Sequence, residues 1–239
     1  MIKLAVSGCL GRMGQRITSL ALEDKSFKIV SLLENKDHPQ IHQTLFNLPI
    51  NSNSVTLKGV NVLIEFTNPE ATLEHLRVCQ KHKVKMVIGT TGFSVEQIQK
   101  IKKASQALPI VFSSNMSVGV NVLFKLAFEA AAKLGNDYAV KIVEAHHLHK
   151  KDAPSGTAKT MAQVIEQASP RKVSDIQSIR EGETIGDHEI IFESPVDTIK
   201  ISHHAKTRDI FVQGSLVAAK FLAKKKNGLF SMQDVLGLA

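Results

Sequence analysis

Short apolar runs alternate with segments of helical spacing in the first half of the chain, and this alternation restricts the fold more than any other feature. The runs are IKLAVS, KIVSLL, VNVLIEF, KMVIG and PIVFS. Between them, apolar residues recur at helical spacing over residues 12–22, 69–82 and 94–107. This order predicts an α/β fold in which helices cover both faces of a parallel sheet. Residues 35–59 are polar and rich in turn formers, so we expect mostly loop there.

The pattern changes after Asn115 and predicts a second domain of the α+β type. Helices are expected over about residues 119–134 and 156–169, with the strand AVKIVEAHH between them. Farther on, HEIIFES and TIKISHH are typical of antiparallel strands. The segment QGSLVAAKFLAKKK predicts a further helix, and Ser231 with Asp234 predicts a short capped one. We predict one domain from residues 1–117 plus 213–239 and a second from residues 118–212.

Composition bounds the class of protein. The 239 residues are 43% apolar, which is enough for a folded core, and no run is long and apolar enough to predict a membrane span. The net charge is +8, but there is no Trp and only one Tyr, so stacking platforms for nucleic acid are scarce. Lys224 to Lys226 are expected to form a solvated end of a helix. Cys9 and Cys79 are too few for a disulfide scaffold and favour a reducing cytoplasm.

Glycines 8, 11 and 14 in GCLGRMG lie between a predicted strand and a predicted helix. Glycines at such a turn allow the backbone to approach a pyrophosphate, and the start of the helix favours an anion. Glu34 closes the second strand, where an acidic side chain can accept hydrogen bonds from a ribose. Cys9 stands where the usual fingerprint has a glycine. A purely structural turn is therefore the alternative to a dinucleotide site.

Two loops are expected at the carboxyl ends of later strands: GTTG from Gly89 to Gly92, and SSNMS from Ser113 to Ser117. Ligands of open parallel sheets bind outside this edge, and both loops offer small residues with accessible backbone amides. We expect them to contact a nicotinamide ribose or ring. Small polar residues also occur in ordinary turns, so each loop alone is a weak signal.

The stretch EAHHLHKKDAPSGTAK gathers histidines, lysines and a turn before a predicted helix. Asp152 or Ser155 can cap that helix, which would aim the amides of Ser155, Gly156 and Thr157 at a carboxylate or phosphate. Lys150 adds a positive charge.

His146 and His147 lie on opposite faces of the preceding strand, whereas His147 and His149 share a face if the strand continues that far. Either His146 or His147 can transfer a proton near neutral pH. A metal is not expected, because no cysteine is near and Lys150 and Lys151 would repel it. The alternative is a solvated turn before a capped helix.

Six motifs in order, GCLGRMGQ, IEFTNPEATLEHL, MVIGTTGF, NMSVGVNVL, EAHHLHKKDAPSGTA and GLFSMQDVLGL, resemble the 4-hydroxy-tetrahydrodipicolinate reductase (dihydrodipicolinate reductase) family over nearly the whole chain. The resemblance implies a Rossmann-type cofactor domain, an α+β substrate and tetramerisation domain, and reduction of a cyclic dicarboxylate imine by NADH or NADPH.

The resemblance also implies roles for individual residues. His146 would be the acid/base group, Lys150 the catalytic lysine, and His147 a substrate contact, with the substrate carboxylate loop at Gly156 and Thr157. The cofactor-binding segments would be Gly8, Cys9, Leu10, Gly11, Arg12, Met13, Glu34, Gly89, Thr90, Thr91, Ser113, Ser114, Asn115 and Met116.

The chain departs from the family pattern in three places. Residues 35–59 and 168–186 are shorter than is typical, and Asn35 follows Glu34 where many members have an arginine. Two other functions share the glycine turn: another two-domain NAD(P) oxidoreductase acting on a small amino or keto acid, and a non-catalytic NAD(H)-binding sensor. The stretch with His146 and Lys150 discriminates between these alternatives and a dicarboxylate reductase, since only the reductase uses it.

Overall fold

The computed structural model describes residues 1–52, 54–170 and 172–239. The chain divides into two compact units. Unit 1 consists of residues 1–117 and 211–237 with Ala239, and unit 2 consists of residues 118–210 with Leu238. Each unit has its own sheet and its own buried core, so the two are described separately.

Unit 1 is built on an eight-stranded sheet with the order β12-β7-β6-β5-β1-β2-β4-β3. The strands are β1 (Ile2–Ser7), β2 (Phe27–Leu33), β3 (Thr44–Leu45), β4 (Leu48–Asn51), β5 (Val62–Glu65), β6 (Lys85–Ile88), β7 (Pro109–Phe112) and β12 (Gly228–Phe230). Paired strands run parallel except β3 and β4. From β4 to β7 this is the doubly wound order, which reverses between β1 and β5. A crevice outside the carboxyl ends of those two strands is where such sheets bind ligands.

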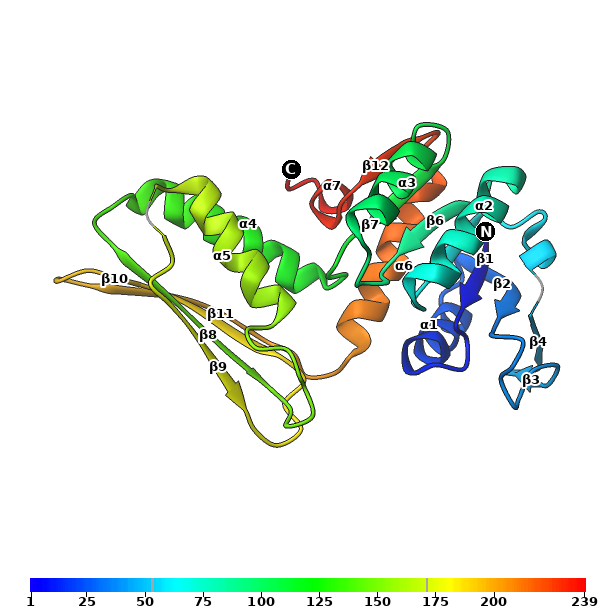
Figure 1. The fold of residues 1–239 in the computed structure, drawn as a ribbon, viewed down its shortest axis with the longest axis horizontal. Coiled ribbons are helices and arrows are strands. Elements are labelled where there is room, and N and C mark those ends of the chain that lie inside the picture. Colours follow the sequence, from blue (N-terminus) through cyan, green and yellow to red (C-terminus); the bar gives the residue numbers. More distant parts are fainter. Residues whose placement is uncertain (53, 171) are drawn as a thin grey trace. The chain divides into compact units, whose positions relative to one another are not determined.

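The helices of unit 1 are α1 (Arg12–Glu23), α2 (Pro69–His82), α3 (Val95–Ser105), α6 (Asp209–Ala223), whose first residues belong to unit 2, and α7 (Met232–Leu236). Figure 1 shows these helices lying against the strands of the unit 1 sheet. Asn68 caps α2 through a hydrogen bond from the Ala71 amide, and Ser231 with Asp234 forms the predicted capping box of α7. The α/β class and the five strand positions of the first half are therefore confirmed.

The described residues of 35–59 are mostly loop, as expected, but unit 1 contains short elements and one contact that the sequence did not predict. Residues 35–59 contain β3, β4 and the 3-10 helix η1 (Ser54–Leu57), whose short lengths leave no periodic signal. Strand β12 is three residues long and was missed for the same reason. Helix α6 ends at Ala223, and Lys225 is not simply solvated. Its ammonium lies 4.4 Å from the ring centroid of Phe221 and 5.3 Å from that of Phe230.

Unit 2 holds a four-stranded sheet with the order β11-β10-β8-β9. The strands are β8 (Ala139–His146), β9 (Asp175–Arg180), β10 (Asp187–Glu193) and β11 (Thr198–His204), and the helices are α4 (Val118–Leu134) and α5 (Gly156–Ala168). The antiparallel pairing of β10 with β11 is confirmed, and β8 also runs antiparallel to β10. Strand β9, which is parallel to β8, was missed because DIQSIR has only two apolar residues.

Helices α4 and α5 cover one face of this sheet, as Figure 1 shows. Side chains alternate along each strand, and those on the covered face form the apolar core at one end of the sheet, with Ile142, Ile190 and Phe192 wholly buried. Toward the other end the same face becomes polar, with Glu144, His146 and His188 in the corresponding positions. The fold thus places titratable groups at the continuation of a buried core.

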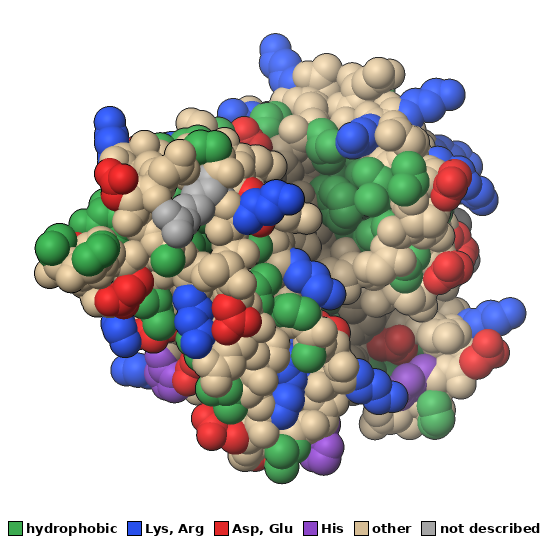
Figure 2. Space-filling model, turned by 60° about the vertical axis from the view of Figure 1, so that its left-hand side comes forward, with side chains coloured by type: hydrophobic (Ala, Val, Ile, Leu, Met, Phe, Trp, Pro, Cys, Tyr) green, Lys and Arg blue, Asp and Glu red, His purple; other side chains and the backbone are tan. Residues whose placement is uncertain are grey.

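Lysine and arginine side chains are spread over the visible surface in Figure 2 and do not gather into one basic patch there. Among the described residues, no helix combines the length and the apolar character that a membrane span requires.

Candidate functional site

The glycine turn after β1 is closed by short backbone contacts that side chains would prevent. Gly8 has φ of +65°, in the left-handed region that favours glycine. A Cβ built on Gly14 would lie 2.0 Å from the carbonyl oxygen of Gly8, so α1 can pack against the turn only with glycine at this position. The Gly11 amide donates to the same oxygen at 3.0 Å. These contacts have the functions that dinucleotide-binding turns give to their glycines.

Helix α1 begins without a side-chain cap, since its N-cap residue is Gly11. The first amides of the helix, including those of Arg12 and Met13, are therefore suited to an anion such as a pyrophosphate. Cys9 contributes only its backbone, because its side chain is wholly buried. Burial, helped by the charge of Glu34, raises the pKa of the Cys9 thiol to about 12, so it stays protonated.

Glu34 lies one residue beyond β2 and faces the glycine turn. Its carboxylate accepts hydrogen bonds from the Leu10 amide through Oε2 and from the Asn35 amide through Oε1, both at 2.9 Å. These contacts orient the carboxylate while leaving lone pairs for further donors. The side chain is only partly buried, so ribose hydroxyls can reach it. The observation fits a dinucleotide, whose ribose diol would donate to Glu34.

The two later loops follow β6 and β7 at the carboxyl edge of the sheet. Gly89 and Thr91 are accessible, but Thr90 is buried, and its hydroxyl oxygen accepts from the Thr67 amide at 3.0 Å. Thr90 can therefore meet a ligand only through its backbone.

In the loop after β7, the hydroxyl of Ser113 donates to the carbonyl of Asn115 at 2.9 Å, and Ser114 is exposed. Asn115 and Met116 are buried. The carbonyl of Met116 touches α6, where a Cβ on Gly214 would lie 1.7 Å from its oxygen. Helix α6 thus fixes the base of this loop.

The sequence reasoning did not select the loop after β5 as part of the site, although the structure places it between the glycine turn and the loop after β6. A Cβ on Gly8 would meet the Thr67 side chain at 2.9 Å, and one on Gly89 would meet the Phe66 ring at 2.3 Å. Both glycines therefore also make room for this loop. The signal in the sequence was FTNP after a strand, which occurs in many turns.

A buried pair holds the loop after β5 in place. The carboxylate of Glu65, wholly buried at the end of β5, accepts from the Thr67 hydroxyl and lies 2.7 Å from Nδ1 of His75 on α2. Burial alone would lower the pKa of His75, but the hydrogen bond and charge of Glu65 outweigh it and raise the pKa. This pair stabilises the backbone beside the cofactor turn.

The strongest cluster of unit 2 surrounds His146, the last residue of β8. Its Nδ1 lies 2.5 Å from Oε2 of Glu144, two residues earlier on the same face of the strand. Arg180, the residue of β9 that lies opposite His146 of β8, donates to Glu144 with both terminal nitrogens, at 3.0 and 2.8 Å. Glu144 is wholly buried, and His146 is 8% exposed. The sequence reasoning singled out neither Glu144 nor Arg180, because Arg180 comes from the unpredicted strand.

Charges in this cluster are set by burial and by the ion pair. Burial alone would raise the pKa of Glu144, but hydrogen bonds, that from Arg180 above all, hold it at about 2. Burial lowers the pKa of His146 and outweighs the opposite effect of Glu144, and the charges of Lys150 and Arg180 lower it further. At neutral pH the carboxylate is therefore ionised and the imidazole is mostly neutral.

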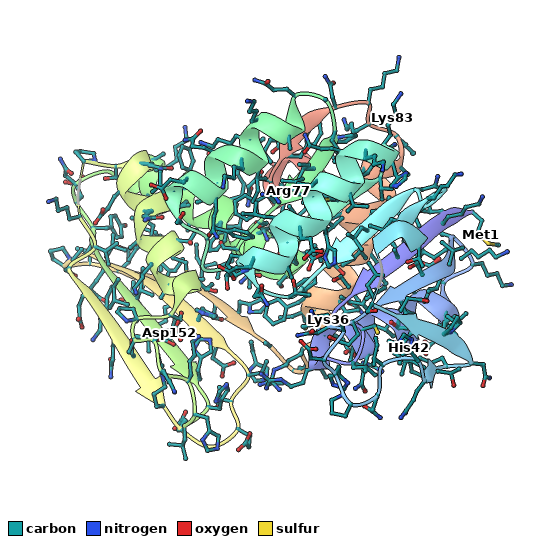
Figure 3. The ribbon with its side chains drawn as sticks, turned by 45° about the vertical axis from the view of Figure 1, so that its right-hand side comes forward. Met1, Lys36, His42, Arg77, Lys83 and Asp152 are labelled. Atoms are coloured by element: carbon teal, nitrogen blue, oxygen red, sulfur yellow. The ribbon has the colours of Figure 1, made fainter. Side chains whose placement is uncertain are left out.

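The segment after His146 leaves the sheet at once. Strand β8 ends at His146, so the condition under which His147 and His149 would share a strand face is not met. Both belong to the following turn, with ring centroids 6.2 Å apart. Lys150 follows, and its ammonium lies 2.8 Å from Oδ1 of Asp152. Figure 3 labels Asp152 in this connection between β8 and α5.

Ser155 is the N-cap of α5, and its hydroxyl oxygen accepts from the Ala158 amide at 3.2 Å. The expectation that the Ser155 amide faces a ligand is wrong. The side chain is buried, and the amide donates inward to Oε1 of Glu144 at 3.3 Å. Gly156 and Thr157, the first residues of α5, are more accessible. Their amides lie at the start of a 13-residue helix and are placed to bind a carboxylate.

Two further histidines, also missed, extend the cluster across the sheet. His188 on β10 pairs with Glu144 on one side and His203 on the other. Its ring centroid lies 5.2 Å from that of His146 and 6.5 Å from that of His203. Both ring nitrogens of His188 and Nδ1 of His203 are buried and lack a hydrogen-bond partner within the described part of the chain. Buried polar atoms of this kind are normally satisfied by water or a ligand.

Across the described ranges, no three His, Cys, Asp or Glu side chains are grouped so that they could hold an ion. The arrangement of unit 2 instead combines an oriented imidazole, a lysine and a helix N-terminus, which together suit proton transfer to an anionic molecule.

Comparisons with known proteins cover both units of the chain. Residues 2–116 match the family model described as dihydrodipicolinate reductase, N-terminus, and residues 119–236 match its C-terminal counterpart. The chain is 41% identical to 4-hydroxy-tetrahydrodipicolinate reductase of Polynucleobacter necessarius, with 99% of each chain covered. It is 42% identical to the reductase of the same name from Nitrosomonas eutropha, covering 100% of this chain and 99% of that one.

Solved structures show the same fold. The dipicolinate-bound dihydrodipicolinate reductase from Paenisporosarcina sp. TG-14 superposes with a TM-score of 0.84 at 26% identity, and 98% of each chain is covered. An amine dehydrogenase from Mycobacterium smegmatis has a TM-score of 0.70 at 10% identity, covering 97% of this chain and 95% of that one, and shares the fold alone. With both family models matched and relatives above 40% identity over full length, the chain belongs to the dihydrodipicolinate reductase family.

Proposed function

We propose that this chain reduces the cyclic dicarboxylate imine derived from 4-hydroxy-tetrahydrodipicolinate to tetrahydrodipicolinate, in lysine and diaminopimelate biosynthesis. The observation that carries the proposal is the oriented imidazole of His146 next to the Lys150 turn and the start of α5. A non-catalytic sensor of NAD(H) would have no use for this cluster. Another two-domain oxidoreductase would share unit 1, but residues 119–236 match the C-terminal family model of dihydrodipicolinate reductase.

NADH or NADPH supplies the hydride, and unit 1 has the groups to hold it. The start of α1 with Arg12 and Met13 would bind the pyrophosphate, and Glu34 would accept from the ribose. The backbones of the loops after β6 and β7, with Gly89, Thr91 and Ser114 accessible, would contact the nicotinamide end.

The side chains of unit 2 would perform the remaining chemistry. Reduction of a conjugated imine moves electron density toward the ring nitrogen, so a proton must be supplied there, and His146 is the donor. Lys150 and the amides of Gly156 and Thr157 would hold a substrate carboxylate, with His147 as a further contact. Positive charge fixed in advance stabilises the dianionic substrate without reorganisation during the reaction.

The proposal extends to a cytoplasmic homotetramer assembled through unit 2. On the sheet face that α4 and α5 leave uncovered, Val143, Ile179 and Ile191 are partly exposed. A hollow of about 190 Å³ on unit 2 is lined in part by Val143, Ala145 and Ser202. Apolar side chains on an uncovered sheet favour pairing with a second copy. Light scattering at assay concentration checks this, and a mass of one chain would contradict it.

The test of the activity is a coupled assay in which pyruvate and aspartate semialdehyde are condensed in place. Oxidation of NADH or NADPH that starts only when both precursors and the condensing enzyme are present supports the proposal. Binding of the cofactor without oxidation would favour the sensor. Oxidation with an unrelated amino or keto acid alone would favour the other class of oxidoreductase.

A further inference from the structure

The wholly buried carboxylate of Glu144 contacts His146, the proposed proton donor, and two groups that surround it, the Ser155 amide and the Arg180 guanidinium. Oε2 lies 2.5 Å from Nδ1 of His146, and Oε1 accepts from the Ser155 amide at 3.3 Å. Arg180 binds both oxygens in a forked geometry, with distances of 3.0 and 2.8 Å. The same guanidinium donates to the carbonyl of Asp152 at 2.6 Å. One ion pair therefore connects β8, β9 and the turn before α5.

The chemistry of these contacts determines which nitrogen of His146 carries the proton. Glu144 is ionised near neutral pH, because Arg180 keeps its pKa at about 2 despite burial. An ionised carboxylate has only acceptors, so the short contact requires Nδ1 of His146 to be the donor. In the neutral imidazole Nε2 is then unprotonated.

Nε2 of His146 faces Gly186, where a side chain would crowd it. A Cβ added to Gly186 would lie 3.1 Å from Nε2 of His146 and 3.6 Å from Cε1 of His188. A glycine, with no side chain, thus flanks the atom. The neighbouring His188 has no hydrogen-bond partner among the residues that the structure describes. Because Nδ1 is occupied by Glu144, Nε2 is the nitrogen of His146 that is left for a substrate or a water.

We propose that the Glu144 and Arg180 ion pair is a positioning element that holds His146 with Nδ1 protonated, so that Nε2 alone exchanges the catalytic proton. The inference rests on the proposed function only in calling the exchanged proton catalytic. The tautomer of His146 is a property of the resting protein. Glu144 also favours the imidazolium by its charge, so it increases the share of His146 that can act as an acid. Neither Glu144 nor Arg180 needs to touch the substrate.

The experiment compares three variants by ¹⁵N NMR of the imidazoles and by kinetics. Glu144→Gln removes the charge and keeps the shape. Glu144→Gln with Arg180→Met also removes the unpaired buried cation, which otherwise destabilises the protein. Glu129→Gln is the matched control, because Glu129 forms an exposed ion pair with Lys125 on α4, with 3.1 Å between the charged atoms. His146→Gln assigns the His146 signal.

In wild type, we expect His146 to titrate from imidazolium to the tautomer with Nδ1 protonated and Nε2 free. In Glu144→Gln the midpoint of that titration should move to lower pH, and the limb of the kcat profile that falls with rising pH should move with it. At neutral pH, kcat should fall by about 10²-fold or more, as when other orienting carboxylates are removed, with KM changed little. Glu129→Gln should resemble wild type in both measurements.

The double variant separates positioning from simple stabilisation. Its melting temperature should recover toward that of wild type, since no buried charge is left without a partner, while its kcat stays as low as in Glu144→Gln. The midpoint of its His146 titration should lie somewhat above that of Glu144→Gln, because the charge of Arg180 no longer lowers the pKa of His146. Recovery of kcat together with stability would mean that the pair is only structural and would overturn the inference. So would a wild-type His146 with Nε2 protonated in its neutral form.

The two proposals fail in different ways. If wild type shows the expected tautomer and the shift in Glu144→Gln but no reductase activity, the proposed function is wrong and the positioning stands. If the reductase is active but the His146 titration is the same in Glu144→Gln, the positioning is wrong and the function stands.

Discussion

The ammonium of Lys150 lies 2.8 Å from a carboxylate oxygen of Asp152. Hydrogen bonding to Lys150 lowers the pKa of Asp152, which the Gly156 amide lowers further, so Asp152 stays ionised at neutral pH. Asp152 therefore engages two of the groups proposed to bind the substrate carboxylate.

Asp152→Asn should lower the KM for the dicarboxylate substrate, because it removes a competing negative charge from Lys150. The effect should be at most about fivefold, since an exposed ion pair contributes no more than about 1 kcal/mol. Lys150→Met, which keeps the length and loses the charge, should raise KM and also lower kcat. A higher KM in Asp152→Asn would show that Asp152 orients Lys150 rather than competing for it. Substrate titrations at low ionic strength give both values.

His188 predicts a pH dependence of stability. Burial, followed by the charge of His146, lowers the pKa of His188 from its ordinary value of 6.5 to about 4, whereas Glu144 and Asp187 act in the opposite direction. The unfolded chain therefore binds more protons than the folded one between these values, and the free energy of unfolding falls as pH falls through this window. From pH 6.5 to 4 the loss attributable to His188 is about 3 kcal/mol.

His188→Leu should remove that part of the pH dependence while leaving stability at pH 7 the same or higher, because an apolar side chain needs no hydrogen bonds. Denaturant titrations of both proteins across the window measure it. Parallel pH curves for the two proteins would mean that His188 is hydrated and titrates normally when folded.

The close packing of α6 on the loop after β7 predicts a sharp effect at Gly214. A Cβ there would lie 1.7 Å from the Met116 carbonyl oxygen. Gly214→Ala should therefore destabilise the protein by about 2 kcal/mol, net of a helix-propensity gain of up to about 1 kcal/mol. Val217→Ala, at a position of the same helix that is 39% exposed, is the control and should change stability little. Equal melting temperatures for the two variants would show that α6 can shift away from the Met116 carbonyl at little cost.

Cofactor choice depends on the residues after β2. Glu34 suits a free ribose diol, and Asn35 offers no charge to a 2′-phosphate, although Lys36 adds a single positive charge nearby. We expect comparable kcat/KM for NADH and NADPH. Asn35→Arg should raise the NADPH to NADH ratio by about tenfold, the effect of one charge-assisted pair. A hundredfold preference for NADPH in wild type would contradict the role given to Glu34.

The parts of the fold that were predicted correctly are those with long periodic signals. Helix α2, with Asn68 and Pro69 at its start, matched its predicted range because capping and periodicity agree. Strands β3, β9 and β12 were missed because short or polar strands are fixed by pairing with neighbours rather than by their own sequence. The domain boundaries proposed from sequence stay a prediction.

The site shows the same limit. His146 and Lys150 stand together in the sequence and could be selected from it. Glu144 and Arg180 could not, because they are 36 residues apart and meet only through the pairing of β8 with β9. The orientation of a catalytic side chain depends on tertiary contacts, and these cannot be read from one sequence.

The most direct test of the proposed reductase function measures both NADH oxidation and tetrahydrodipicolinate formation in the coupled assay, in wild type and in His146→Gln. Glutamine keeps a hydrogen-bond donor but cannot exchange a proton at neutral pH, so kcat should fall by about 10²-fold to 10⁴-fold with cofactor binding intact. Wild type should form one tetrahydrodipicolinate for each NADH oxidised. Equal turnover in the two proteins, or oxidation of NADH without that product, would contradict the reductase function assigned to this site.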